Sequence, residues 1–420
     1  MKNTVKNFMF YIAFVASLGG LLFGFDTAVI SGAEKSIQTV YGLSDFSHGF
    51  TIAIALIGTI IGAFICSKPV EKYGRLKALK IIAFLYFVSA VGSAAIIDWY
   101  SFLFFRFAGG LAVGASSVVG PMYIAEISPS RWRGRFVAFF QFNIVLGIVL
   151  AYFSNYWIHG IAHDWQWMLG VEAIPAIVFA LLLYTVPESP RWLVKQNKET
   201  EARRIIKEVS NADIEQEVHE IRESLVATGN CGEKLFQRKY RKPILYAFLI
   251  ATFNQLSGIN AILYYAPRIF EMSGVFTDSA MMQSIVIGLT NLTFTMIGMI
   301  LIDQVGRKKL LYIGSIGMAI SLALVAKGFC QDTFSGYYML ACLMGFIAFF
   351  AISLGAVIWV LISEVFPNSI RSKGQVLGSM THWVWSALLS WMFPVFIRTG
   401  GTFIFSFFAI MMFLSFFFAL

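Results

Sequence analysis

Long apolar stretches alternate with short polar segments along most of the chain, and only the middle of the sequence breaks this pattern. A membrane-spanning helix needs about 17 to 25 mainly apolar residues. From Pro190 to about Lys242 the residues are charged and helix-forming, and no apolar run there is long enough to span. Stretches that are long enough fall near residues 8–30, 49–67, 78–97, 101–126, 136–157 and 167–186, and again near 243–271, 280–302, 310–329, 336–365, 375–397 and 402–420.

This arrangement predicts an all-α integral membrane protein with twelve transmembrane helices in two six-helix halves. The N-terminal half is expected over residues 1–189, a linker of short helices over 190–242, and the C-terminal half over 243–420. The composition agrees, because 58% hydrophobic and only 13% charged residues give more apolar surface than a soluble fold of this length can bury.

The positive charges of the chain lie in short loops between the apolar stretches. The formal charge of +9 therefore predicts membrane topology rather than a nucleic-acid-binding face. The loops after spans two, four, eight and ten and the linker are rich in Lys and Arg, whereas the opposite loops hold little beyond Lys35, Lys327 and Arg398. Both termini and the linker are expected in the cytoplasm. No metal site or disulfide framework is predicted from the scattered cysteines Cys66, Cys231, Cys330 and Cys342.

Two loop motifs occur once in each half of the chain. The segment 71–77, Glu-Lys-Tyr-Gly-Arg-Leu-Lys, follows span two, and 303–309, Asp-Gln-Val-Gly-Arg-Lys-Lys, follows span eight, 303 − 71 = 232 residues later. The segment that starts at Glu126 closes span four, and the one that starts at Glu364 closes span ten, 364 − 126 = 238 residues later. Two motifs at nearly one offset predict two related halves, a construction that transporters use for alternating access around a site between them.

Three carboxamides lie within the first span of the second half, at Asn254, Gln255 and Asn260. Polar side chains in a membrane span are costly and usually face a bundle interior or a watered cavity. Gln255 and Asn260 would not share a face of a regular helix, so we expect a break at Ser257-Gly258. The alternative is that these amides only join helices by hydrogen bonds.

A charged pair is expected in the first half. Asp26 lies late in span one, and Arg106 near the start of span four is its expected partner. The arginine keeps the carboxylate ionised while the two are paired, and their separation in a low-dielectric site favours uptake of a proton. A permanent structural ion pair is the alternative.

Further polar and aromatic side chains lie within the spans. A carboxamide offers both a hydrogen-bond donor and an acceptor to a polar ligand, and an aromatic ring offers an apolar face. Gln141 in span five and Asn291 in span eight are such carboxamides, although Asn291 is equally suited to tie helices together. Trp359 in span ten and Phe23 in span one are candidates for the apolar contacts.

The chain resembles the sugar porters of the major facilitator superfamily over nearly its whole length. The most specific evidence is Pro-Glu-Ser-Pro-Arg-Trp-Leu at 187–193, beside the two repeated loop motifs and the Gln-x-x-Gly-x-Asn core of 255–260. The resemblance is closest to bacterial D-xylose/proton symporters. It implies the major facilitator fold, a multi-pass protein of a bacterial inner membrane, and import of a monosaccharide with protons. It also implies no cofactor besides the coupling proton and function as a monomer in the lipid bilayer.

The same resemblance implies roles for single residues. Asp26 would take up the coupling proton and Arg106 would modulate its affinity, while Gln141, Gln255, Asn260, Tyr265 and Trp359 fall on sugar-contacting positions. Three departures are compatible with a sugar other than xylose. Asn254 and His382, which precedes Trp383, stand where the similar symporters carry Gln, and no Pro follows Gly355. Cytoplasmic ion pairs between the halves are implied for the outward-open state, among Glu71, Arg75, Glu126, Arg133, Glu188, Arg191, Asp303, Arg307, Glu364 and Arg371.

Other functions remain as alternatives at this point. A proton-independent sugar uniporter would share the site, and a non-transporting sugar sensor would bind the same ligand. An enzyme or an ATP-driven carrier is disfavoured, because the sequence holds no Walker motif, metal-ligand spacing or nucleophile motif. Sugar porters usually continue into a cytoplasmic tail, whereas this sequence stops within the apolar residues 416–420. The sugar itself and the stoichiometry are left open by the sequence.

Overall fold

The computed structural model describes residues 3–129, 132–209, 214–229, 235–331, 336–367 and 370–419, and these residues form helices joined by short connections. The first part contains α1 (Asn3–Val40), α2 (Asp45–Ile65), α3 (Ser67–Tyr73), α4 (Arg75–Ala95), α5 (Trp99–Ile127), α6 (Arg133–Ile158), α7 (Asp164–Gly170) and α8 (Ala173–Leu182). The linker region contains α9 (Pro190–Lys195), α10 (Glu199–Val209) and α11 (Ile214–Gly229).

The remaining helices follow after the linker. They are the 3₁₀ turn η1 (Arg238–Tyr240), α12 (Arg241–Leu256), α13 (Ile259–Tyr264), α14 (Ala266–Met272), α15 (Thr277–Gln304), α16 (Arg307–Gln331), α17 (Gly336–Phe350), the π-helical turn η2 (Ala351–Gly355), α18 (Ala356–Val365), α19 (Arg371–Thr399) and α20 (Gly401–Ala419). Twelve helical segments among the described residues are long and apolar enough to cross a membrane. This confirms the predicted all-helical membrane fold.

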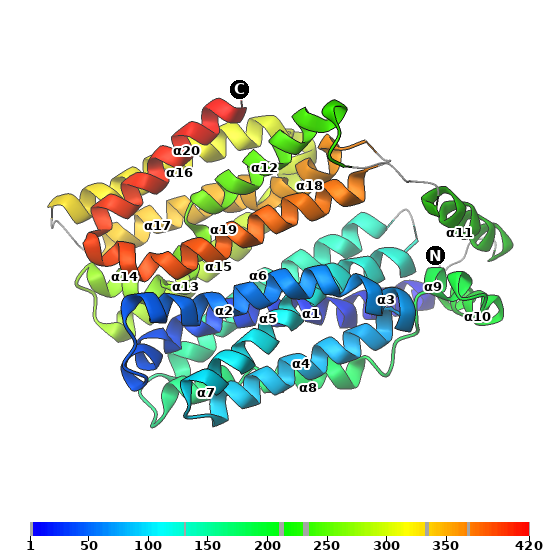
Figure 1. Ribbon diagram of the computed structural model, residues 1–420, viewed down its shortest axis with the longest axis horizontal. Coiled ribbons are helices and arrows are strands. Elements are labelled where there is room, and N and C mark those ends of the chain that lie inside the picture. Colours follow the sequence, from blue (N-terminus) through cyan, green and yellow to red (C-terminus); the bar gives the residue numbers. More distant parts are fainter. Residues whose placement is uncertain are drawn as a thin grey trace.

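The two halves lie side by side (Figure 1), with α9, α10 and α11 at the same end of the bundle as the N-terminus. Helix α2 of the first half packs on α19 of the second, and α6 packs on α15. A Cβ atom at Gly49 would lie 1.8 Å from the carbonyl oxygen of Trp391, so glycine allows the backbones of α2 and α19 to touch. We call the end of the bundle that lies away from the linker helices the linker-distal end.

The short linker helices pack on the first half. Helix α10 buries the apolar side chains of Ala202, Ile205 and Val209 in the same cluster as Met9 of α1. Its charged face is exposed, and Arg203 pairs there with Glu215 of α11. The charged, helix-forming segment predicted from the sequence therefore contains amphipathic helices in the structure.

The first helix differs from its prediction. The span was expected to end near residue 30, but α1 continues to Val40. The added turns carry Glu34 and Gln38, whose side chains contact α2 and α14 instead of water. Polar residues that find partners in the protein do not end a membrane helix, and this is why the hydropathy pattern placed the boundary too early.

Three spans are interrupted rather than continuous. The sixth breaks at Val171 and Glu172 between α7 and α8. The seventh consists of α12, α13 and α14, and the tenth contains the π turn at Ala351–Gly355. Interruptions of this kind inside a bundle are frequent at functional sites of transporters. Each of the three lies beside a group of polar side chains described below.

Candidate functional site

The break in the seventh span lies at the expected place. Helix α12 ends at Leu256, and Gly258 has a φ of +83°, a left-handed conformation that favours glycine. The Ser257 hydroxyl donates to the carbonyl of Asn254 at 2.6 Å and accepts from the backbone N–H of Ile259 at 3.3 Å. The side chain thus satisfies backbone groups that the break leaves without helical partners.

This break brings two of the predicted amides together. The Asn260 amide donates to the Gln255 side-chain oxygen at 3.0 Å, although five residues separate them in the sequence. It also donates to the Ser386 hydroxyl of α19 at 2.6 Å. Gln255 in turn donates to the side-chain oxygen of Asn254 at 2.9 Å, and Asn254 donates to the Leu354 carbonyl in η2 at 3.2 Å. A regular helix would not allow this arrangement.

An aromatic group adjoins the amides. The Gln255 amide lies 3.2 Å from the ring nitrogens of His382. The His382 ring is flanked by Trp359 and Trp383, with ring centroids 5.0 and 4.9 Å apart. Trp359 is 38% exposed, whereas Gln255 is 1% exposed, so the indole is the more accessible face of this group.

Phe23 of the first half meets the same group from the other side. Its ring centroid lies 5.7 Å from that of Trp383. The structure therefore places a predicted residue of span one against the predicted residues of span eleven, across the boundary between the halves. A planar indole next to carboxamides is a suitable surface for the two faces of a sugar ring.

Four other predicted site residues are less closely connected. Among the described residues, Gln141 of α6 is half-buried and lies outside the hydrogen-bonded amide group. Asn291 of α15 is buried and accepts from the Thr295 hydroxyl at 3.3 Å, within its own helix. Tyr265 is fully buried, donates to the Ser390 carbonyl at 3.1 Å and stacks on Phe393. Gly355 lies at the end of the π turn.

The charged pair predicted in the first half is formed. Asp26 of α1 and Arg106 of α5 are 4% and 3% exposed, and Nη1 of Arg106 donates to Oδ1 of Asp26 at 2.5 Å. An unpaired charge at this depth would be very costly, and each group of the pair supplies the other with a partner. The Arg106 Nε, also buried, has no hydrogen-bond partner among the described residues.

Glu172 joins this pair and was not predicted. It lies in the break between α7 and α8, is 2% exposed, and interacts electrostatically with both Asp26 and Arg106. Its Oε1 atom has no hydrogen-bond partner in the described part of the chain. The site therefore holds two carboxyl groups for one guanidinium. A lone acid inside the apolar stretch 167–186 was the available sequence signal, and it was the same signal that identified Asp26.

A small cavity connects the charged pair with the aromatic group. Its volume is about 10 Å³, room for about one water molecule. Asp26 and Arg106 line it from the first half, and Tyr264 and Trp383 line it from the second. Asp26 and the aromatic group thus line one cavity.

The loop motifs of the first half form a compact network. Arg75 makes a bidentate pair with Glu126, with distances of 2.7 and 2.8 Å, and Ser189 donates to the same carboxylate at 2.6 Å. Glu188 accepts from the backbone N–H groups of Arg75 and Leu76. Burial raises the pKa of Glu188, and the backbone N–H groups that it accepts from oppose this rise.

The second half repeats one of these contacts. Arg307 at the start of α16 pairs with Glu364 of α18 at 3.1 Å, as Arg75 does with Glu126. Each of these two pairs lies within one half. Ion pairs between the halves were predicted for the outward-open state, so the observed pattern is compatible with a different state. Glu71 pairs with Lys195. Arg133 and Arg371 are exposed, and Arg191 is half-buried. The described part of the structure does not include the side chain of Asp303, nor Arg131, Cys231 and residues 368 and 369.

Ion pairs that join the halves occur at the linker-distal end. Arg268 of α14 pairs with Glu34 of α1 at 3.2 Å, and Arg398 of α19 pairs with Asp45 of α2 at 2.9 Å. Lys35 of α1 also pairs with Glu271 of α14. These three pairs join the halves at this end, where His159 of the first half also lies 3.4 Å from Asp278 of the second.

Comparison with known proteins identifies the family. The sequence profile described as "Sugar (and other) transporter" matches residues 12–420. The chain belongs to this family. It is 40% identical to the D-xylose-proton symporter of Escherichia coli (strain K12), over 94% of this chain and 87% of that protein. It is 37% identical to the arabinose-proton symporter of Bacillus subtilis (strain 168), over 92% of this chain and 85% of that one.

A solved structure of the family shares the fold. It is the xylose transporter XylE from E. coli in a partially occluded inward open conformation, with a TM-score of 0.87 and 37% sequence identity. The match covers 98% of this chain and 97% of that one. The major facilitator fold of two six-helix halves, the membership in a transporter rather than an enzyme family, and the multi-pass membrane character predicted from the sequence are therefore confirmed.

Proposed function

We propose that this sugar transporter family member imports a monosaccharide, a pentose such as xylose or a hexose, together with protons by alternating access. The observation that carries the proposal is one small cavity that is lined both by the charged pair of Asp26 and Arg106 and by Trp383 of the aromatic group. The relatives named as proton symporters support the same reading. A proton-independent uniporter would not need a buried acid at residue 26.

The proposed sugar site is the amide and aromatic group between the halves. Gln255 and Asn260 supply hydrogen bonds, Trp359 supplies the exposed aromatic face, and Phe23 closes it from the first half. His382 replaces a flexible amide with a rigid ring that is already packed between two indoles. We propose that this rigidity changes the choice of sugar relative to the xylose symporters.

The deciding experiment is uptake into proteoliposomes of labelled pentoses and hexoses, with and without an inward proton gradient. Accumulation of one sugar above its outside concentration, only with the gradient, is the expected result. Counterflow that is independent of pH would instead indicate a uniporter. Binding without any transport would indicate a sensor.

The arrangement of ion pairs supports an inward-facing state. Pairs join the halves at the linker-distal end through Arg268 and Arg398, and the pair of Arg75 lies within one half. We propose that the linker and both termini are cytoplasmic, as the loop charges predict. We also propose that the protein acts as a monomer in the lipid bilayer, with the proton as its only coupling ligand.

Replacing Gln255 with Ala should weaken sugar binding by about tenfold or more. The loss of one side chain that bonds a buried hydroxyl costs about 1–3 kcal/mol, and each 1.4 kcal/mol corresponds to a factor of ten. The measurement is equilibrium binding of the transported sugar to purified protein. Gln304→Ala, at the exposed end of α15, is the matched control and should bind normally. Equal affinity of both variants would place the sugar elsewhere.

Replacing Arg133 with Ala should shift the protein further toward inward-open forms by about two- to fivefold. Arg133 is exposed in this structure, so the variant loses an ion pair only in the outward-open state, where we expect such a pair to contribute at most about 1 kcal/mol. The ratio of outward to inward accessibility of single cysteines reports the shift. Arg135→Ala, also exposed, is the control, and identical ratios for both variants would count against the gating role.

A further inference from the structure

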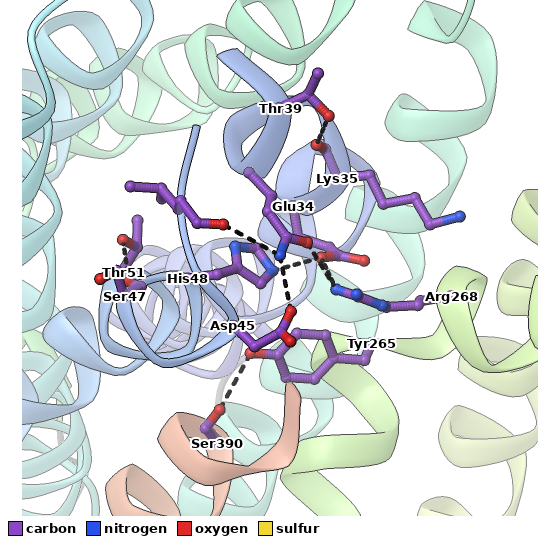
Figure 2. A network of polar contacts seen from close by, with 12 residues as sticks. Glu34, Lys35, Thr39, Asp45, Ser47, His48, Thr51, Tyr265, Arg268 and Ser390 are labelled. Carbon is purple, nitrogen blue, oxygen red and sulfur yellow. Dashed lines mark hydrogen bonds and ion pairs between the residues drawn. The ribbon is translucent and has the colours of Figure 1, made fainter. Parts of the chain in front are cut away.

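Glu34 is a buried carboxylate with two possible counter-charges. It is 1% exposed, and its Oε2 atom lies 2.6 Å from Nε2 of His48 and 3.2 Å from Nη1 of Arg268. Figure 2 shows His48 and Arg268 approaching this carboxylate from different elements. His48 belongs to α2 of the same half and is 0% exposed, whereas Arg268 belongs to α14 of the other half.

The contacts of His48 indicate which charge is in place here. With Arg268 next to Glu34, a neutral His48 that donates a hydrogen bond through Nε2 is the second partner of the carboxylate. The other ring nitrogen, Nδ1, is buried and has no hydrogen-bond partner among the described residues. A protonated ring would bury a second N–H group without an acceptor, which is costly. The present arrangement therefore favours Glu34 paired with Arg268 beside a neutral His48.

Alternating access changes this balance. When the halves separate at the linker-distal end, Arg268 leaves with α14, while Glu34 and His48 stay together on α1 and α2. Glu34 would then be a carboxylate without its cation, and such a group must be neutralised or paired again. Histidine is the side chain that ordinarily changes charge between pH 5 and 8.

We propose that Glu34 and His48 form a second proton-binding site, in which a proton on His48 replaces Arg268 as the counter-charge when the halves separate at this end. The proton and Arg268 compete for one carboxylate. Acid conditions on this side therefore favour the separated, outward-open form. The site lies eight positions along α1 from Asp26, and it regulates the gate rather than the sugar site.

Several polar and charged groups surround this site. The Tyr265 ring lies 6.1 Å from that of His48, and Gln38 bridges Arg268 and Asp45 at 3.1 Å each. Helix α5 starts after Asp98, and its Trp99 donates a hydrogen bond to the Thr51 hydroxyl. The remaining charges are the pairs of Lys35 with Glu271 and of Asp45 with Arg398. The range from pH 8 to 5.5 covers the pH values at which histidine ordinarily changes charge, and the variants of His48 and His163 described below assign the response.

The inference rests on the alternating access of the proposed function, but not on the identity of the sugar or on coupling at Asp26. The test therefore measures the gate itself. Spin labels at Val40 and Phe276, both exposed, report the distance between the halves in lipid nanodiscs, after replacement of the native cysteines. The full chain is used without sugar, in the Asp26→Asn background and in the wild-type one.

The separated fraction should rise as the pH falls from 8 to 5.5, with a limiting slope of about tenfold in the ratio of states per pH unit for one proton. His48→Gln should abolish this response, whereas His163→Asn, an exposed histidine at the same end, should keep it. A pH-independent wild type, or a His48→Gln variant with the full response, would overturn the proposal.

Two further variants guard against a folding defect in His48→Gln. Glu34→Gln removes the charge for which the proton and Arg268 compete, so its pH response should also disappear. Arg268→Gln should raise the separated fraction at pH 8 and flatten the pH response, because the proton then pairs with Glu34 in both states. An unchanged response in both variants would contradict the competition. Failure of sugar accumulation with an intact gate response would refute only the proposed symport.

Discussion

Asp26→Asn should abolish accumulation of sugar against its gradient and leave exchange of sugar across the membrane partly intact. Uphill transport needs a group that binds a proton in one state and releases it in the other, and asparagine cannot bind one. Exchange needs only the sugar site and the movement of the halves. The amide of asparagine still accepts a hydrogen bond from Arg106, so the variant keeps the contact between α1 and α5.

The surroundings of Asp26 explain why the loss should be complete. Arg106 pairs with it directly, and the buried carboxyl group of Glu172 interacts electrostatically with the same guanidinium. If Arg106 turns toward Glu172 in another state, Asp26 is left buried without its partner and takes up a proton. The cavity lined by Asp26 and Trp383 then passes the change to the aromatic group.

The measurement is active uptake and counterflow in the same proteoliposomes, with and without a proton gradient. The expected result is no accumulation above the outside sugar concentration, and counterflow within about a factor of ten of the wild type. Glu172→Gln is a companion variant, since it leaves Asp26 able to take a proton but removes the competing carboxyl group; it should alter the pH dependence of uptake without abolishing it. Undiminished accumulation by Asp26→Asn would refute the assignment.

The fold could be predicted because membrane spans are set by a local property, the length of an apolar run. The limits of this rule appear at the end of α1, where Lys35 was counted as a loop charge. The helix continues because Glu34 and Gln38 find partners on α2 and α14, and such partners depend on packing between distant segments. The ion pairs at the linker-distal end could not be predicted from the sequence for the same reason.

The site residues that could be predicted are those whose polar side chains are energetically costly inside a membrane span. Asp26, Gln255 and Asn260 stand out as polar groups in apolar spans, and the structure groups them with partners as expected. Glu172 carried the same signal and was passed over. The role of Tyr265 depends on the direction of its side chain, and residue spacing along a broken helix does not give that direction. In the structure its hydroxyl donates a hydrogen bond to the Ser390 carbonyl.

Gly258→Leu should reduce transport by about tenfold or more while the protein still folds and binds sugar. Gly258 has a φ of +83°, and a side chain in this conformation costs about 1–3 kcal/mol. A Cβ atom there would also lie 2.5 Å from two ring atoms of Phe408, a fully buried residue of α20 that has little room to move. The substitution would force α13 away from α20 or straighten the break.

Gly274 offers a matched control for this variant. It has nearly the same φ, +82°, but a Cβ atom there would meet no atom within 4 Å. Gly274→Leu therefore carries the backbone strain without the steric contact, and it should transport nearly as well as the wild type. Comparing the two by uptake rate, and by sugar binding at equilibrium, separates strain in general from the geometry of this break.

The comparison decides whether the break works as a hinge or only as a fixed shape. A hinge predicts that Gly258→Leu binds sugar in one state but exchanges slowly between states, so that binding survives and uptake falls. A fixed shape predicts that binding and uptake fall together, because Gln255 and Asn260 meet only through the break. Normal transport by Gly258→Leu would exclude both roles, since the left-handed turn and its contact with Phe408 would then be dispensable.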